Sequence, residues 1–326
     1  MAAAPVIPRS VNYFISRVCN YSCKFCFHTA KNDRILPLAR AQEGLCLLKE
    51  AGCEKMNFAG GEPFMQPKFL GELCRTSAEM GMAVSIISNG SLVSPRWMDE
   101  YARYVDILGV SVDSFVPTTN AAIGRGGDAH NRHAQRMMRV RDMCSRHDVL
   151  FKLNTVVNRL NFEEDMNDQI AALDPYRWKA FQVLLLEGEN TGGKSLRDAR
   201  ALVISRSEFD AFCARHAERP QLIPEPNDVM QNSYLLLDEA LSFLNCAGGG
   251  KTPSRSILDV GVDAALTEAG FDEGKFEERG GVFEWRRPRA QAGAAELEGA
   301  AQWRGHPVGA RGGPGTDSHA NIIMNS

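Results

Sequence analysis

Three cysteines stand within eight residues of one another, in the stretch Cys19-Asn-Tyr-Ser-Cys23-Lys-Phe-Cys26. Thiolates at this spacing can hold three corners of a four-iron cluster and leave the fourth iron open to a ligand. Two other interpretations are open. Structural zinc takes four Cys or His ligands, and His28 could complete such a set, while unpaired cysteines are often simply buried. The spacing favours the iron–sulfur cluster.

A second motif, Phe58-Ala59-Gly60-Gly61-Glu62-Pro63, ends an apolar run. Glycine has no Cβ, so paired glycines let the backbone approach a ligand closely, and Glu62 could anchor that ligand. A Gly-Gly pair alone is a weak signal, since most such pairs form turns. Its position after the cysteine triplet gives it weight.

Short β-branched or apolar runs alternate with longer segments of helical periodicity, which is the pattern of repeated βα units around a parallel sheet. The runs predict strands at 11–18, 55–58, 83–88, 106–112, 150–156 and 180–186. The segments between them predict helices at 37–51, 67–80, 95–103, 129–147 and 162–173. Six βα units are two short of a closed eight-fold barrel, so we expect an α/β fold, an open partial (βα)6 barrel. Both motifs then lie at the carboxyl ends of strands, where such folds carry their chemistry.

The pattern changes after Glu187. Helical stretches are predicted at 207–216 and 232–244, and we expect this part to pack as a cover on the barrel. Towards the end of the chain, hydrophobic periodicity is lost and Gly, Ala, Arg and Pro dominate, which predicts a disordered tail. The expected divisions are an N-terminal lead (1–10), the partial barrel (11–215), a C-terminal extension covering the active site (216–287) and the low-complexity tail (288–326).

The composition of the 326-residue chain narrows the class of protein. A net charge of -3 gives no general attraction for nucleic acid or anionic lipid, so any anion site must be a local cluster of Lys and Arg. No apolar run approaches the roughly 20 residues that span a bilayer. Nine scattered cysteines, an odd number, are unlike a secreted disulfide framework. We therefore expect a soluble, cytoplasmic protein without an intrinsic membrane segment or a nucleic-acid partner.

The two motifs together resemble those of the radical S-adenosylmethionine (SAM) superfamily in their order, spacing and placement after the first two strands. From about residue 11 to 285 the chain further resembles the viperin family of antiviral radical-SAM nucleotide dehydratases. The stretches that carry this resemblance include 19–31, 88–92, 113–115, 123–126, 158–161, 177–179, 187–190, 233–239 and 256–262.

The resemblance implies a site for two cofactors. Cys19, Cys23 and Cys26 would bind a four-iron four-sulfur (4Fe–4S) cluster, whose open iron takes the amino and carboxylate groups of SAM. The SAM site would be lined by Gly60, Gly61, Glu62, Ser88, Asn89, Ser111 and Arg125. The last two would hold the SAM carboxylate, a task that suits the planar guanidinium of Arg125.

The resemblance also implies a nucleoside triphosphate substrate, held by Lys55, Lys152, Asn154, Arg177, Lys179 and Lys251. A triphosphate carries roughly four negative charges, which these cations would balance. By itself, each Lys would more often be a solvated surface group. However, Lys152 and Asn154 are two residues apart, as are Arg177 and Lys179, so each pair shares one face of a strand. Lys251 lies in a Gly-rich run that could close over phosphates or could be a flexible surface loop.

The function that the resemblance implies is a lyase reaction. A nucleoside triphosphate, with CTP as the first choice, is converted to its 3'-deoxy-3',4'-didehydro analogue, an antiviral chain terminator. Tyr234 would finish the radical reaction; without the resemblance it would be a half-buried aromatic in a helix. The expected partners are an electron donor and iron–sulfur assembly factors. The family's short C-terminal tail, which serves cluster delivery, is replaced here by 288–326, and its N-terminal amphipathic helix is absent, so lipid association is not implied.

Two alternative functions are open. Another radical-SAM nucleotide enzyme, such as a GTP cyclase, would need a second cluster near the carboxyl end, and the isolated Cys213 and Cys246 argue against one. A zinc-stabilised interaction protein would contain zinc without iron. Within the favoured function, the sequence does not select among CTP, UTP and GTP.

Overall fold

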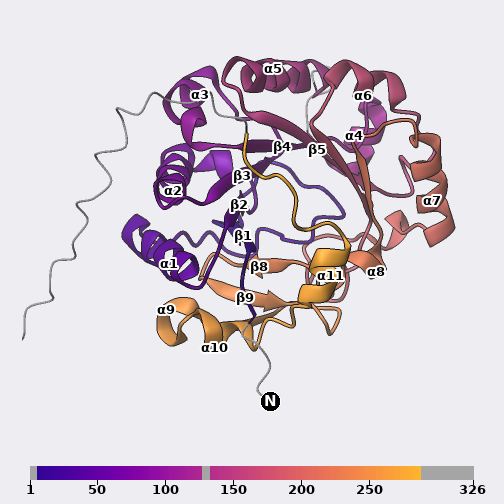
Figure 1. Ribbon diagram of the computed structural model, residues 1–326. Helices are drawn as coiled ribbons and strands as arrows, with labels where there is room; N and C mark the ends of the chain where they lie inside the picture. Colours follow the sequence, from indigo (N-terminus) through magenta and orange to yellow (C-terminus); the bar gives the residue numbers. More distant parts are fainter. Residues whose placement is uncertain (1–5, 127–132, 288–326) are drawn as a thin grey trace, which may run out of the picture. The chain divides into compact units, whose positions relative to one another are not determined.

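Parallel strands form the centre of the computed structural model, which describes residues 6–126 and 133–287 (Figure 1). The strands are β1 (Ser10–Phe14), β2 (Lys55–Ala59), β3 (Ala83–Ser88), β4 (Ile107–Ser111), β5 (Leu150–Val157) and β6 (Arg177–Gln182). Each predicted strand is present, and each pairs in parallel with its neighbour in the chain. β6 begins earlier than predicted because Arg177 and Lys179 alternate with the buried Trp178 and Ala180, as residues on the two faces of a strand do.

Helices cover the outer face of this curved sheet (Figure 1). They are α1 (Leu38–Glu50), α2 (Pro67–Glu79), α3 (Pro95–Tyr101), α4 (Pro117–Ile123), α5 (His133–Arg146), α6 (Asn167–Leu173) and α7 (Arg206–Arg215). α6 is shorter than predicted, because Asn161 holds a turn before it: its Oδ1 accepts a 2.7 Å hydrogen bond from the backbone N–H of Asn158. The first residues predicted for α5, 129–132, lie outside the described residues.

Further strands come from the C-terminal extension. β7 (Leu222–Glu225) pairs in parallel with β6, and β8 (Leu235–Leu237) pairs in parallel with β1. β9 (Ser242–Asn245) and β10 (Thr252–Ser256) continue from β8 as antiparallel strands. The sheet of the described residues therefore has the order β10-β9-β8-β1-β2-β3-β4-β5-β6-β7. The C-terminal extension widens the sheet of the barrel at both edges. That it also covers the active site stays a prediction.

The helix predicted at 232–244 is wrong, and Tyr234 does not lie in a helix. Leucine favours helices, but a short apolar run suits a buried strand equally well, and here pairing with β1 decides. Leu241 has a φ of +61°, which no continuous α-helix allows, and it turns the chain from β8 into β9.

Short helices complete the described chain: α8 (Asn227–Met230), α9 (Ile257–Val260), α10 (Val262–Leu266) and α11 (Glu273–Glu278), with 3₁₀ helices at Pro63–Met65, Ala102–Tyr104 and Arg200–Leu202. After α11 the chain crosses the amino ends of the strands, where Arg287 donates hydrogen bonds to the carbonyls of Arg103 and His147. In Figure 1 this segment is the yellow trace that leaves α11. Among the described helices, none is long and apolar enough to span a membrane. The tail predicted at 288–326 lies outside the described residues, and the boundary expected between 215 and 216 stays a prediction.

Candidate active site

The cysteine loop, residues 19–26, leaves the sheet beside the glycine pair, Gly60 and Gly61. Backbone pairing between the two segments continues beyond β1 and β2: the N–H of Gly61 donates to the carbonyl of Ser16, and that of Glu62 to the carbonyl of Val18, both at 2.8 Å. β1 ends before its predicted limit because the pairing here is no longer that of a regular strand. The cysteine loop is thereby fixed to the carboxyl end of β2.

Glycine is required at both positions of the pair by the closeness of this pairing. A Cβ on Gly61 would lie 2.0 Å from the carbonyl oxygen of Val18. Gly60 has a φ of +144°, and a Cβ there would lie 2.5 Å from the carbonyl oxygen of Ser16. The sequence predicts that the backbone approaches a ligand at these glycines; within the described protein, the approach is to the cysteine loop.

We expect Gly61→Ala to lower the free energy of unfolding by about 1 to 3 kcal/mol, because the new methyl group meets backbone that cannot rotate away. Gly193→Ala is the matched control, since a Cβ at Gly193 meets no atom within 4 Å. Urea denaturation of both variants measures the difference. Equal stability of the two variants would contradict the role assigned to Gly61.

The three thiols of the loop lie close enough to affect one another. Burial raises the pKa of each, that of Cys23 to about 11, and a neighbouring thiol adds to the increase: Cys23 for Cys19, Cys26 for Cys23 and Cys19 for Cys26. Within the described residues, no three His, Cys, Asp or Glu side chains are arranged to hold a single metal ion. A 4Fe–4S cluster fits this arrangement, because each thiolate binds a different iron.

His28 is not arranged as a fourth zinc ligand. Its Nδ1 lies 2.9 Å from Nζ of Lys251, and its ring packs on Phe14 with centroids 4.2 Å apart. Burial, followed by the charges of Lys251, Arg17 and Lys31, holds the pKa of His28 well below its usual value. The geometry therefore gives no support to the zinc alternative.

Glu62 binds together the ends of β2 and β3. Its Oε1 accepts hydrogen bonds from the Ser88 hydroxyl (2.7 Å) and the Phe64 N–H (3.1 Å), and its Oε2 accepts one from the Asn89 N–H (2.7 Å). Burial nevertheless raises the pKa of Glu62, against the effect of these donors. The Asn89 side chain in turn donates to Asn20 in the cysteine loop at 2.8 Å. Three of the residues predicted for SAM thus adjoin the cysteines.

Arg125 follows a segment that contacts the cysteine loop, since the N–H of Ser22 donates to the carbonyl of Gly124 at 3.3 Å. Nε of Arg125 donates to Oδ2 of the buried Asp113, and no other hydrogen bond of its guanidinium is found within the described residues. The charge of Arg125 lowers the pKa of the Cys23 thiol, against a larger effect of burial. Ser111 ends β4. Arg125 can therefore present its remaining N–H groups to a carboxylate beside the cysteines.

A buried network of ion pairs on the same loop is not predicted from the sequence. Arg17 donates to Oε1 of Glu239 at 2.9 Å and to Oε1 of Glu189 at 3.0 Å. Thr29 donates to Oε2 of Glu189 from both its N–H (2.9 Å) and its hydroxyl (2.7 Å). Burial alone would raise the pKa of Glu189, but Lys251, Thr29 and Arg17 lower it to about 2. The stretch 187–190, which contributes to the family resemblance, is the signal that could have found this network.

Cations gather inside the barrel on β2, β5 and β6. Lys152 is in register with Arg177, and Asn154 with Lys179. Lys55 reaches the same region from β2, since its Nζ lies 5.0 Å from the ring centre of Phe283 and the Arg177 guanidinium lies 4.2 Å from it. Burial, then the charges of the other cations, lowers the pKa of Lys55 to about 7 and that of Lys152 well below its usual value. These side chains form the group predicted to bind phosphates.

Lys251 does not join this group. Its Nζ lies 3.7 Å from Oε1 of Glu189 and contacts His28, beside the cysteine loop. Burial lowers the pKa of Lys251 to about 8, although Glu189 opposes that change. Its assignment to the substrate stays a prediction.

Two further charged side chains, Glu225 and Arg279, lie in the cation group formed by Lys55, Lys152, Arg177 and Lys179. The sequence does not predict either of them. Glu225, at the end of β7, forms ion pairs with Lys179 and, at 3.5 Å, with Arg279. The Tyr234 hydroxyl donates to Oε2 of Glu225 at 2.8 Å and accepts from Nζ of Lys179 at 3.0 Å. Burial raises the pKa of Tyr234 well above its usual value. Tyr234 therefore belongs to the cation group rather than to a helix above it.

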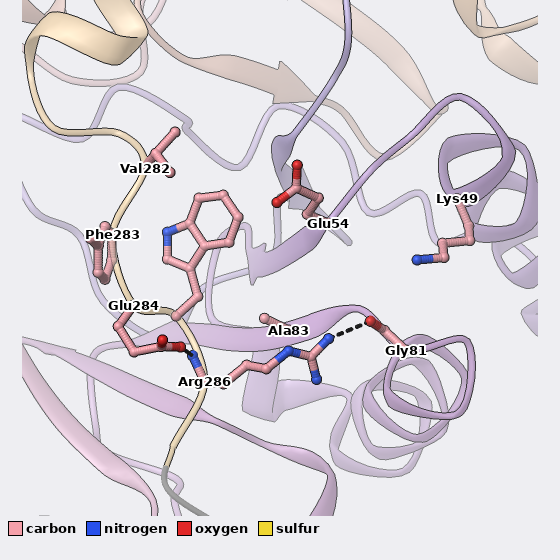
Figure 2. Close-up of a pocket in the computed structure, with 9 residues that line it drawn as sticks. Lys49, Glu54, Gly81, Ala83, Val282, Phe283, Glu284 and Arg286 are labelled. Carbon is pink, nitrogen blue, oxygen red and sulfur yellow. Dashed lines mark hydrogen bonds between the residues drawn. The ribbon is translucent and has the colours of Figure 1, made fainter.

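A cavity of about 360 Å³ lies at the amino ends of β2 and β3, away from the cysteine loop (Figure 2). Its lining includes Lys49, Glu54 and residues 282–286, and Arg286 crosses it to the carbonyl of Gly81. Phe283 lines this cavity and also contacts Lys55 and Arg177. The segment after α11 thus forms a floor beneath the cations.

The fold and the cysteine loop define a radical SAM enzyme, and the model of the Radical SAM superfamily matches residues 13–172. Solved structures agree at the level of the fold. SuiB of Streptococcus suis bound to S-adenosylmethionine has a TM-score of 0.59 and 16% identity, over 84% of this chain and 67% of that chain. The structure of anSMEcpe with bound AdoMet has a TM-score of 0.56 and 13% identity, over 82% and 78%.

Two relatives identify the family. The S-adenosylmethionine-dependent nucleotide dehydratase RSAD2 of Danio rerio is 51% identical over 285 residues, which are 86% of this chain and 79% of that protein. The S-adenosylmethionine-dependent nucleotide dehydratase of Flammeovirga pacifica is 34% identical over 288 residues, which are 86% of this chain and 97% of that protein. The chain belongs to the S-adenosylmethionine-dependent nucleotide dehydratase family, as its resemblance to the viperin family predicts. It is therefore a lyase with a 4Fe–4S cluster and SAM as cofactors.

Proposed function

We propose that this dehydratase acts on a nucleoside triphosphate, with CTP as the first choice, and forms the 3'-deoxy-3',4'-didehydro nucleotide. The observation that supports a triphosphate is a set of buried cations without enough anions. Lys55 and Lys152 are buried and form no ion pair with any described residue, and the Nε–H of Arg177 is buried without an acceptor. The roughly four negative charges of a triphosphate would balance the cations and restore the lysine pKa values.

The residues divide into two groups along the barrel. We assign Cys19, Cys23 and Cys26 to the cluster, and the polar ends of β2, β3 and β4 to SAM through Glu62, Ser88, Asn89, Ser111 and Arg125, with Gly60 and Gly61 beside them. When bound, these cofactors supply the radical that takes hydrogen from ribose C4'. Lys55, Lys152, Asn154, Arg177 and Lys179 hold the triphosphate below them. Two fixed groups position C4' against the cofactor, and the buried floor under the cations excludes water.

Tyr234 is the residue assigned to the last chemical step. Removal of hydrogen from C4' and loss of the 3'-hydroxyl as water leave the nucleotide one electron short of the closed-shell product. A phenol can supply that electron from within the site. The support is its contact with Lys179, one of the residues assigned to the triphosphate.

The product explains a biological role. A nucleotide without a 3'-hydroxyl cannot be extended by a polymerase, so we propose antiviral chain termination as its use. The proposed partners are a one-electron donor, which the cluster requires, and iron–sulfur assembly factors.

Anaerobic incubation of the reconstituted protein with SAM, dithionite and one triphosphate at a time tests this function. We expect the dehydrated nucleotide and 5'-deoxyadenosine to form together with CTP, and deuterium at C4' of CTP to appear in the 5'-deoxyadenosine. Mass spectrometry measures both. Cleavage of SAM without any dehydrated nucleotide from CTP, UTP or GTP would refute the proposal.

A further inference from the structure

The two hydrogen bonds of the Tyr234 hydroxyl fix the direction in which its proton points. Nζ of Lys179 donates to the phenol oxygen at 3.0 Å, so the phenol proton points to its second partner, Oε2 of Glu225, at 2.8 Å. The carboxylate of Glu225 is 1% exposed. Tyr234 therefore shares its proton with a single buried carboxylate that water does not reach.

A phenol gives up an electron readily only when its proton leaves at the same time, because the oxidised phenol is a strong acid. We propose that Glu225 accepts the phenolic proton of Tyr234 while Tyr234 passes one electron to the dehydrated nucleotide. This inference rests on the proposed function, in which Tyr234 completes the reaction.

The step balances in atoms and charge. The nucleotide has lost a hydrogen atom from C4' and, with uptake of one proton that solvent supplies, the 3'-hydroxyl as water. Its ribose is then a radical cation, which one electron converts to the uncharged alkene. Tyr234 loses that electron and becomes a tyrosyl radical, while the O–H bond breaks and the proton forms the carboxylic acid of Glu225. An external one-electron donor, of the class that reduces the cluster, then reduces the tyrosyl radical, and the proton returns from Glu225.

The charges around Glu225 make it a better base when substrate is present. Lys179 and Arg279 face its carboxylate and lower its pKa, against the effect of burial, so it is ionised at neutral pH. The guanidinium of Arg177 adds positive charge to the same group, and burial together with this charge lowers the pKa of Lys152. A bound triphosphate would offset these cations, and the carboxylate would then hold a proton more strongly. A bound triphosphate therefore favours transfer of the proton to Glu225.

Glu225→Gln is the discriminating variant, because the amide oxygen still accepts a hydrogen bond from Tyr234 but is not a base. At saturating CTP we expect SAM cleavage and deuterium transfer from C4' to continue, while dehydrated nucleotide formed per 5'-deoxyadenosine falls at least about tenfold. Tyr234→Phe should show the same loss. Glu225→Asp retains a carboxylate and should restore most of the yield.

A wild-type yield per 5'-deoxyadenosine in Glu225→Gln would overturn the inference. An equal loss of dehydrated nucleotide in the Gln and Asp variants would also overturn it, because the site would then depend on the shape of the Glu225 side chain and not on its basicity. If Glu225→Gln does not fold, Glu225→Asp still tests the inference. Because it retains a carboxylate, it should form more dehydrated nucleotide per 5'-deoxyadenosine than Tyr234→Phe does. The proposed function fails separately, if the wild-type protein forms no dehydrated nucleotide at all.

Discussion

Cys23→Ala is expected to abolish formation of 5'-deoxyadenosine while leaving the barrel folded. Two thiolates cannot hold three irons of a cluster, and without the open iron SAM has no site at which to accept an electron. The substitution removes one sulfur atom at a half-buried loop position that lies outside the strands. Iron and sulfide content after anaerobic reconstitution, together with chromatography of 5'-deoxyadenosine, measures the effect, and circular dichroism measures the fold.

Cys46→Ala is the matched control, because Cys46 is exposed on α1 and far in sequence from the cysteine loop. It should retain full iron content and activity. Normal SAM cleavage by Cys23→Ala, or a wild-type protein that binds one zinc and no iron, would contradict the assignment of the loop.

Most of the barrel follows from the sequence because its strands and helices differ in the period of their apolar residues. The β-branched run of β3 was predicted with its exact bounds of Ala83–Ser88. The strand β8 is not predicted, because its run of leucines fits the period of a helix as well as that of a strand. Its partner β1 lies more than two hundred residues earlier in the chain. Local pattern cannot report a pairing over such a separation.

The residues of the candidate site also differ in how far the sequence predicts them. The cysteines and the glycine pair form motifs with fixed spacing, so the sequence locates them directly. Glu225 and Arg279 have no such motif, since their positions in the cation group depend on how the C-terminal extension crosses the barrel. The family resemblance assigns Lys251 to phosphates, while its Gly-rich context favours a flexible surface loop. In the structure its side chain is buried beside His28 and Glu189, and its assignment to the substrate stays a prediction.

Replacement of Lys152 and Lys179 together by Met should weaken CTP binding by about 10²- to 10⁴-fold. Each charge-assisted hydrogen bond contributes about 1.5 to 3 kcal/mol, which corresponds to roughly 10- to 100-fold for each lysine. Methionine retains most of the buried volume of the lysine stem, so the change removes charge rather than packing. Isothermal titration calorimetry of the anaerobic protein measures the affinity for CTP and, separately, for SAM, which should barely change.

Lys68→Met is the control for this pair, since Lys68 is exposed on α2 and its replacement should leave the affinity for CTP unaltered.

The pH dependence of CTP binding gives an independent measure of the role of these lysines. Burial lowers the pKa of Lys55 to about 7 and that of Lys179 to about 8, so these lysines lose their charge as the pH rises through those values. The affinity of the wild-type protein for CTP should therefore fall between pH 7 and 9. The double variant should show a smaller fall, because Lys179 is absent and its charge no longer lowers the pKa of Lys55. Unchanged CTP affinity in the double variant at pH 7 would exclude these lysines from the triphosphate site, and the buried positive charge of the barrel would then need another anion.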